Sequence, residues 1–176
     1  TVGRDIYFGI KDVKSLTGVT GDKVISSIEG VEEETRIKSK NLKWLDVLIY
    51  LSPKVNATAF KALASIGFFS TKSTNVSRNK ALYEYEIFKM LTKKEKEWVL
   101  NNYSDKKWTT LEECMIDLCP TKKNGGGTHH VARSQLIENE LEMIRNPPFS
   151  LDDDPSWIVA QEVKFLGCPI SLAKID

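Results

Sequence analysis

The sequence predicts a mostly α-helical protein: a compact multi-helix domain with at most a short N-terminal strand. Apolar residues recur at helical spacing along most of the chain, capping residues precede these segments, and glycine or proline follows them. The β-prone run is at residues 6–10. With 176 residues, of which 41% are hydrophobic and 28% charged, the composition is typical of a globular chain that buries a core.

The first expected elements surround a glycine-containing turn. Residues 6–10 form the expected strand, and residues 11–15 follow as a short helix. A second helix begins near Asp22, because an acidic residue is favoured in a first helical turn. We expect this helix to end at Gly30, since glycine is the commonest residue just past a helix C-terminus.

Two further helices are expected before residue 70. The first runs from about residue 42 to residue 51 and stops at Pro53, because proline cannot continue a helix. The second is capped by Asn56 and ends at Gly67, which readily adopts the left-handed backbone of a helix end. A polar connector over residues 70–77 follows.

Five more helices complete the prediction. Three of them begin at Ser77, Thr92 and Thr110. The fourth runs from about residue 130 to residue 145, and the fifth runs from about Pro155 to Leu166. Thr92 and Glu95 form a capping box, in which each side chain satisfies a backbone N–H group near the other. Asp152–Asp154 lie at the start of the last helix, where negative charge is favourable to the helix dipole. The glycine-rich segment 122–128 is the clearest flexible loop.

Charge is unevenly distributed along the chain. The formal net charge is +1, yet residues 36–107 hold 15 Lys and Arg against 6 Asp and Glu, a local balance of +9. The same count gives −3 over residues 1–35 and −5 over residues 108–176. A basic middle favours a polyanionic partner such as nucleic acid. The alternative interpretation is a solvated, lysine-rich helical surface.

Nothing in the sequence indicates a membrane or secreted protein. No apolar run approaches the ~18 residues that span a bilayer, and the start lacks the pattern of a signal peptide. The three cysteines form no disulfide framework, which favours a reducing cytoplasm. Because the first residue is Thr1 rather than methionine, we expect the chain to be cut from a longer protein.

Residues 16–24, Leu-Thr-Gly-Val-Thr-Gly-Asp-Lys-Val, are the most informative motif. They have the pattern of the hairpin and second-helix start of a helix–hairpin–helix module. The glycines allow a tight turn and a close backbone approach. The turn leads into a helix N-terminus, where free N–H groups and the helix dipole favour a phosphate. The motif therefore predicts binding to the nucleic-acid backbone without reading of the base sequence.

Catalytic and metal-binding patterns are weak. Cys114 and Cys119 with His129 and His130 do not have the spacing of known zinc sites, so two buried cysteines and two loop histidines are the simpler interpretation. The run 152–154 could hold metal ions, but consecutive acids at a helix start more often complement the dipole. We expect no metal site and no catalytic residue in this chain.

Further motifs accompany the hairpin in a definite order. They are Phe8-Gly9-Ile10 with Lys11-Asp12-Val13, Leu42 to Leu48, Val55-Asn56, Ala59-Phe60 with Leu63, Ile66 to Phe69, Glu162 to Gly167, and Cys168-Pro169-Ile170. In this order and spacing the chain resembles a stretch of the bacterial replicative DNA polymerase III alpha subunit, a C-family DNA polymerase. The resemblance covers residues 6–69 and 157–171, whereas residues 70–156 match only as helical segments.

This chain departs from the family pattern at identifiable positions. Thr20 stands where the family has the second hairpin glycine, with Gly21 directly after it. Cys168 replaces the usual histidine before Pro169. With these departures, the sequence resembles a phage-type or otherwise remote polymerase more than a typical cellular one.

The resemblance implies a division of the chain and a role for each part. Residues 1–69 would contain the end of the fingers and the helix–hairpin–helix DNA-binding module. Residues 70–176 would be a lineage-specific helical extension that ends at a domain boundary. The catalytic carboxylates of the family lie upstream in the palm. The parent nucleotidyltransferase would need Mg²⁺, whereas this stretch would carry no cofactor.

The resemblance also implies a set of DNA-binding residues. They are Gly18, Val19, Thr20 and Gly21, through their backbone N–H groups, with Lys23 beside them and Lys11 and Lys14 adding further charge. The expected partner is the backbone of double-stranded primer–template DNA in the cytoplasm of a bacterial or phage-infected cell. Such contacts would weaken with salt and ignore base sequence.

An alternative function is a protein-interaction module of the replisome. Residues 135–141, a glutamine followed by spaced apolar residues, loosely resemble a sliding-clamp peptide, so the helices over 130–166 would bind a clamp or another replication subunit. An amphipathic helix face explains the same apolar spacing. A stand-alone enzyme is a third hypothesis, which no motif supports.

Overall fold

The protein is mostly helical in the part that its computed structural model describes, namely residues 10, 13–16, 18–119 and 131–170. This confirms the predicted fold class. Most of the expected N-terminal strand, residues 6–9, lies outside the described residues, and the described residues contain no strand. No helix among them combines the length and the hydropathy that a membrane span requires.

The chain forms two compact units. Unit 1 comprises residues 1–82 and 152–176, and unit 2 comprises residues 83–151. Unit 2 is thus an insertion between two segments of unit 1, and the boundary at residue 82 falls within helix α5 (Arg78–Lys89). This division by packing does not coincide with the boundary at residue 69 that the resemblance suggests. The roles assigned to the two sides of that boundary stay a prediction.

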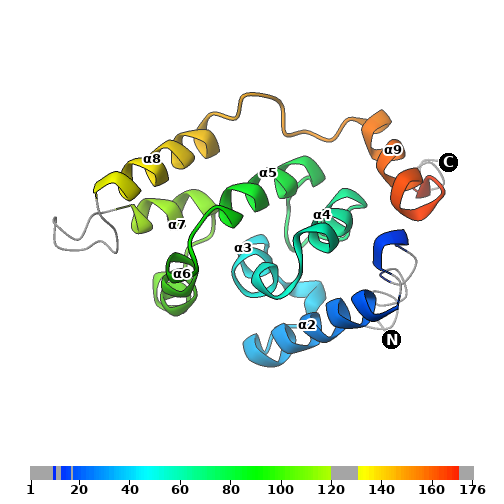
Figure 1. Ribbon diagram of the computed structural model, residues 1–176, viewed down its shortest axis with the longest axis horizontal. Coiled ribbons are helices and arrows are strands. Elements are labelled where there is room, and N and C mark those ends of the chain that lie inside the picture. The colour runs from blue at the N-terminus through cyan, green and yellow to red at the C-terminus, as the bar shows by residue number, and fades with distance from the viewer. Residues whose placement is uncertain (1–9, 11–12, 17, 120–130, 171–176) are drawn as a thin grey trace. The chain divides into compact units, whose positions relative to one another are not determined.

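The first elements described in unit 1 are the short 3₁₀ helix η1 (Lys14–Leu16) and the long helix α2 (Val19–Thr35), seen in blue in Figure 1. The expected end at Gly30 is wrong, because α2 continues until Arg36 adopts a left-handed conformation with φ of 61°. The fully buried Val31 lies just beyond Gly30. Burial of Val31 offsets the cost of a glycine inside a helix, about 1 kcal/mol.

Residues 39–65 form a series of short helical segments. They are η2 (Ser39–Asn41), α3 (Trp44–Asp46), the π-helical turn η3 (Val47–Leu51), η4 (Ser52–Lys54) and α4 (Ala57–Ser65). The predicted cap is confirmed, since the Asn56 side chain accepts a hydrogen bond of 2.8 Å from the backbone of Ala59. The chain leaves α4 through Gly67, whose φ of 84° is in the left-handed region that favours glycine.

The core of unit 1 lies among α2, the segments between residues 42 and 51, and α4. Its largest completely buried side chains are Ile10, Leu16, Ile28, Leu48, Ile49, Leu51, Phe60 and Leu63. Phe60 stacks on Phe69 with a centroid distance of 4.5 Å, and Trp44 packs against both rings. These aromatic contacts join α3, α4 and the segment that follows α4.

Arg78 joins three segments of unit 1 at the start of α5. Its guanidinium donates to the Ser65 carbonyl and to the Glu162 carboxylate, each at 3.2 Å. Glu162 lies on α9 (Pro155–Leu166) and its side chain is 2% exposed. The same guanidinium covers Gly67 so closely that a Cβ there would lie 2.7 Å from Arg78 Nε. Arg78 therefore links the C-terminal end of α4 to α9.

The acidic run before α9 caps two helices rather than one. Asp154 accepts a hydrogen bond of 3.1 Å from the Trp157 backbone and caps α9, as predicted. The two oxygens of Asp153 instead accept from the backbone N–H groups of Arg78 and Asn79 at 3.0 Å each, at the start of α5. The expectation that the whole run serves the last helix is therefore incomplete. A carboxylate distant in sequence satisfies the free N–H groups of α5.

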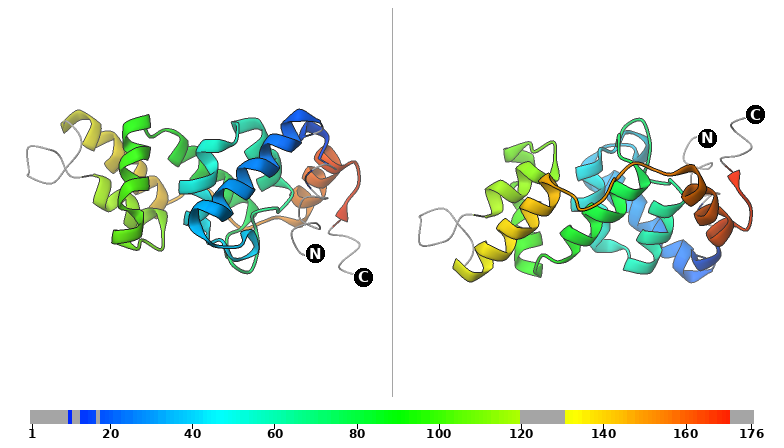
Figure 2. Two further views of the ribbon diagram at one scale, coloured as in Figure 1. Left: turned by 90° about the horizontal axis from the view of Figure 1, so that it is seen from below. Right: turned by 90° about the horizontal axis from the view of Figure 1, so that it is seen from above.

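Unit 2 contains the C-terminal part of α5 and three further helices: α6 (Lys93–Lys106), α7 (Leu111–Leu118) and α8 (Val131–Arg145). α7 and α8 run side by side, as Figures 1 and 2 show. The capping box is confirmed, with Thr92 and Glu95 exchanging hydrogen bonds of 2.8 and 3.2 Å. Thr110 caps α7 through the Glu113 N–H. The predicted loop at 122–128 lies outside the described residues.

A buried ion pair joins α8 to the start of α6 within unit 2. Arg133 donates to both oxygens of Glu95, at 2.8 and 2.6 Å, and Glu95 is 4% exposed on its side chain. Close by in this charge network lies Glu140, which is buried and has one carboxylate oxygen without a hydrogen-bond partner. Burial raises the pKa of Glu140, the neighbouring Glu95 raises it further, and Arg133 opposes the change.

We expect Glu140→Gln to stabilise the protein at neutral pH and to have little effect in acid. A carboxyl whose folded pKa is raised contributes its full stability below the unfolded pKa of about 4.3, and loses it as the pH rises through the folded value. Glutamine has no such loss, so the advantage of the variant should grow with pH. Urea unfolding of both proteins across this range measures it. An advantage that is the same at every pH would contradict the assignment.

Candidate nucleic-acid interface

At the position of the predicted hairpin, the 3₁₀ helix η1 is followed by α2, with Gly18 directly before α2. Leu16, at the end of η1, is completely buried, and its N–H donates to the Val13 carbonyl at 2.9 Å. Gly18 then turns the chain with φ of 67°, a conformation that L-residues rarely adopt, and a Cβ there would meet nothing within 4 Å. The backbone conformation, rather than lack of space, therefore requires glycine at residue 18.

Gly21 is required for a different reason. It is buried in the first turn of α2, and a Cβ on it would lie 2.2 Å from the Leu16 carbonyl oxygen. Thr20, which stands at the family's second glycine position, is only half-buried. The close approach of η1 to α2 thus depends on Gly21, and the turn accommodates a side chain at residue 20.

The N-terminal end of α2 is accessible. The first intrahelical hydrogen bond runs from the Asp22 N–H to the Gly18 carbonyl at 3.1 Å. Helix geometry leaves the N–H groups of the preceding residues without intrahelical partners, and Gly18 has no side chain with which to cap them. Val19 is 70% exposed at this end. The helix dipole adds a partial positive charge here.

A shallow depression of about 440 Å³ lies beside this helix end. Its lining, which we call the hairpin depression, consists of Val19, Asp22, Lys23, Ser26, Ser27 and Lys54. Lys54 comes from η4, and its backbone carbonyl accepts a hydrogen bond of 3.3 Å from the Ser27 hydroxyl. The Lys54 ammonium also pairs with Glu34 at 2.8 Å, with both side chains partly exposed.

Lys54 is a site residue that the sequence did not reveal. It follows Pro53 in a segment predicted only as a helix stop, and no spacing relates it to Lys23. The two lysines line the same depression only because η4 packs beside α2. With Asp22 also present, the depression combines two cations and one anion.

Of the other two lysines predicted to bind DNA, Lys14 is not on the lining of the depression. Lys11 lies outside the described residues. Lys14 is exposed, and its ammonium would lie 3.9 Å from a Cβ on Gly167, the C-terminal cap of α9. Positive charge at a helix C-terminus is stabilising. The side chain of Lys14 is thus positioned at the end of α9, because η1 and α9 pack together (Figure 1).

The residues of the predicted clamp motif lie on α8, where they divide between surface and core. Gln135 and Leu136 are exposed, the latter by 51%. Ile137 is completely buried and Leu141 is 5% exposed, so both belong to the core of unit 2. A partner that needs all these apolar side chains together would have to displace α8 from that core.

Cysteine and carboxylate residues form no evident metal site in the described part of the chain. All three cysteines are free, and burial raises the pKa of Cys114 to about 12. No group of three or more potential metal ligands occurs within the described residues. His129 and His130, the other members of the weak zinc motif, lie outside them.

No protein-family model, curated protein or solved structure matches this chain.

Proposed function

We propose that this chain is a non-catalytic, DNA-binding part of a replicative DNA polymerase of the C family. In this role it holds the backbone of the primer–template duplex. The observation that carries the proposal is the accessible N-terminus of α2 beside the hairpin depression, with Lys23 and Lys54 on its lining. Backbone N–H groups and the two ammonium groups would donate hydrogen bonds to a phosphate, and the helix dipole would add a favourable partial positive charge.

The two-unit organisation supports the resemblance on which this proposal depends. Both well-matched stretches, 6–69 and 157–171, belong to unit 1, and α9 packs against η1 and α4. Unit 2, residues 83–151, falls inside the stretch that matches only as helical segments. This organisation is what a lineage-specific insertion into a DNA-binding module would produce.

Duplex binding over a series of salt concentrations tests the proposal. We expect measurable affinity at low salt for duplexes of unrelated sequence, and a steep loss of affinity as salt rises. Lys23→Glu combined with Lys54→Glu should lower the affinity and reduce the slope of log K against log salt by about 2, since each phosphate contact contributes about 0.9. Asp22→Asn should have the opposite effect on affinity, because it removes a carboxylate from the lining of the depression.

The matched control is Lys93→Glu combined with Lys94→Glu, which makes the same change in net charge at exposed positions of α6. If the hairpin depression is the site, this control retains most of the affinity and nearly the full salt slope. Equal losses in the two double variants would mean that binding follows net charge alone, and absence of binding at low salt would refute the proposal.

A second candidate is recognition of a replisome protein through α8. Leu136 and Met143 are 51% and 44% exposed and are seven residues apart, so they share one helix face. Capture of the cognate sliding clamp at high salt, lost when Gln135 and Leu136 are changed, would favour this function over DNA binding.

A further inference from the structure

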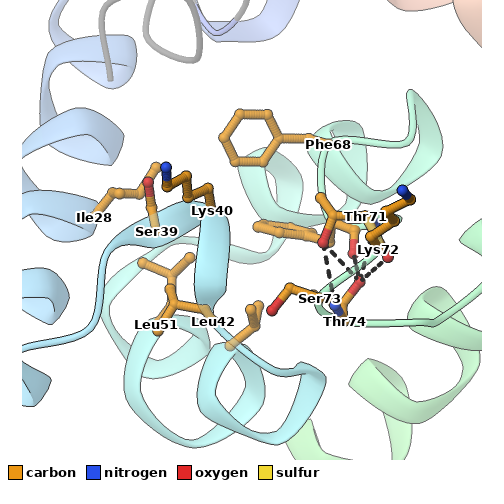
Figure 3. A pocket seen from close by; sticks show the side chains of 12 residues that line it. Ile28, Ser39, Lys40, Leu42, Leu51, Phe68, Thr71, Lys72, Ser73 and Thr74 are labelled. Carbon is orange, nitrogen blue, oxygen red and sulfur yellow. Dashed lines mark hydrogen bonds between the residues drawn. The ribbon is translucent and has the colours of Figure 1, made fainter. Parts of the chain in front are cut away.

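Unit 1 contains an apolar cavity of about 450 Å³ that is separate from the hairpin depression. Figure 3 shows it between α2, the segment 39–51 and the turn that follows Phe68. Its floor and walls are apolar: Ile28, Leu42, Val47, Leu51, Phe68 and Phe69. The volume is within the range of about 300–1,000 Å³ that is typical of ligand pockets.

The wall of the cavity is preformed. Phe69 is 3% exposed and stacks on Phe60 behind it. On the rim, the Thr71 N–H donates to the Thr74 hydroxyl at 3.0 Å, and the Thr74 N–H donates to the Thr71 hydroxyl at 3.1 Å. The Thr74 hydroxyl in turn donates to the Phe69 carbonyl. A rim held in this way needs little ordering when a ligand binds.

The charged residues on the lining of the cavity have one sign. The lining contains Lys40 and Lys72, both exposed, and no carboxylate. In Figure 3 these two lysines lie on opposite sides of the cavity. Lys40 also belongs to the segment 36–43, which carries four exposed basic residues and no acid. The site is therefore complementary to an occupant that has an apolar group for the interior and negatively charged groups on either side of it.

A protein side chain suits the interior better than a nucleobase does. The polar edge of a base would lose its hydrogen bonds to water, and the apolar floor offers none in return. The hydroxyls of Thr71 and Thr74 are already engaged with each other and with the backbone. A large aliphatic or aromatic side chain needs no such partner and would contact Phe68 and Leu51 directly.

We propose that this cavity docks an acidic segment of a partner protein, which inserts a large apolar side chain between Phe68, Leu42 and Leu51 while flanking carboxylates meet Lys40 and Lys72. The site is a recognition surface distinct from the hairpin depression. It does not depend on duplex binding, so the two proposals stand or fall separately.

Short synthetic peptides test this inference on the whole chain by NMR titration. The probe is a set in which two aspartates flank each side of a central pair drawn from Leu, Ile, Phe and Trp. We expect saturable shift changes at residues 28, 39–42 and 68–74 with at least one member of the set. A serine pair at the centre, or lysines in place of the aspartates, should abolish them.

Two kinds of variant locate the binding. Ser73→Trp places a bulky side chain on the rim, and Lys40→Glu with Lys72→Glu reverses the charge of the opening. Each should weaken the best peptide by about tenfold or more, whereas Lys93→Glu with Lys94→Glu should not. Failure of every peptide in the set would overturn the proposal. So would equal binding of the serine-centred peptide, or stronger shifts at the same residues with a short oligothymidylate.

Discussion

Arg78→Met is expected to lower the free energy of unfolding by about 3–5 kcal/mol, the typical cost of removing one partner from a buried ion pair. The variant would leave the Glu162 carboxylate, 2% exposed, without its guanidinium. It would also remove the donor to the Ser65 carbonyl at the end of α4. Urea unfolding followed by circular dichroism measures the loss, and hydrogen exchange of the α9 amides shows whether it arises in unit 1.

A double variant separates the charge effect from the packing effect. Arg78→Met combined with Glu162→Leu removes both charges, so it should be markedly more stable than Arg78→Met alone. If the ion pair has no structural importance, Arg78→Met will lie within about 1 kcal/mol of the unmodified protein, like most surface substitutions. The double variant would then offer no rescue.

Gly21→Ala and Gly30→Ala are expected to change stability in opposite directions, although both place a methyl group in α2. At Gly21 the new Cβ would lie 2.2 Å from the Leu16 carbonyl oxygen, which is backbone and can move only if the hairpin opens. We expect a loss of about 1–3 kcal/mol, the usual cost of overpacking. Duplex affinity should fall with it, because the open hairpin no longer positions the start of α2.

At Gly30 the added Cβ would meet nothing within 4 Å, and α2 is helical on both sides. Alanine should therefore stabilise the protein by about 0.5–1 kcal/mol, the helix advantage of alanine over glycine, and leave duplex binding unchanged. Urea unfolding and a low-salt duplex titration of the two variants provide the comparison. A loss of stability at both positions would contradict the prediction, because close approach to Leu16 would then not be what distinguishes the two glycines.

Helix positions were predictable because their signals are local. Asn56, Thr92 and Thr110 each bond to an N–H group three residues ahead, so a single short window of sequence contains the whole interaction. Gly30 shows where such reasoning fails. Its pattern is that of a helix stop, but burial of Val31 continues α2 to Thr35, and burial depends on what packs against the helix.

The hairpin itself was predictable in part. A turn at the glycines and a helix after it follow from residue types and their order, although the helix starts at Val19 rather than near Asp22. The sequence did not show whether residue 20 or residue 21 must be glycine, because the answer depends on the approach of Leu16 to Gly21 across the turn. The position of the Lys14 ammonium near Gly167 likewise depends on the packing of η1 on α9, and its contact with DNA stays a prediction.

The sequence by itself determined that this chain is mostly helical, where most helices begin, and that a glycine turn leads into the N-terminal end of a helix. Each of these properties depends on residues within about one helical turn of each other. Only the tertiary structure decided that Lys54 joins Lys23, that Asp153 caps α5, and that the lysine-flanked apolar cavity exists. The Arg78–Glu162 pair spans 84 residues of sequence, and only packing of α9 against the N-terminal segment of unit 1 makes the pair possible.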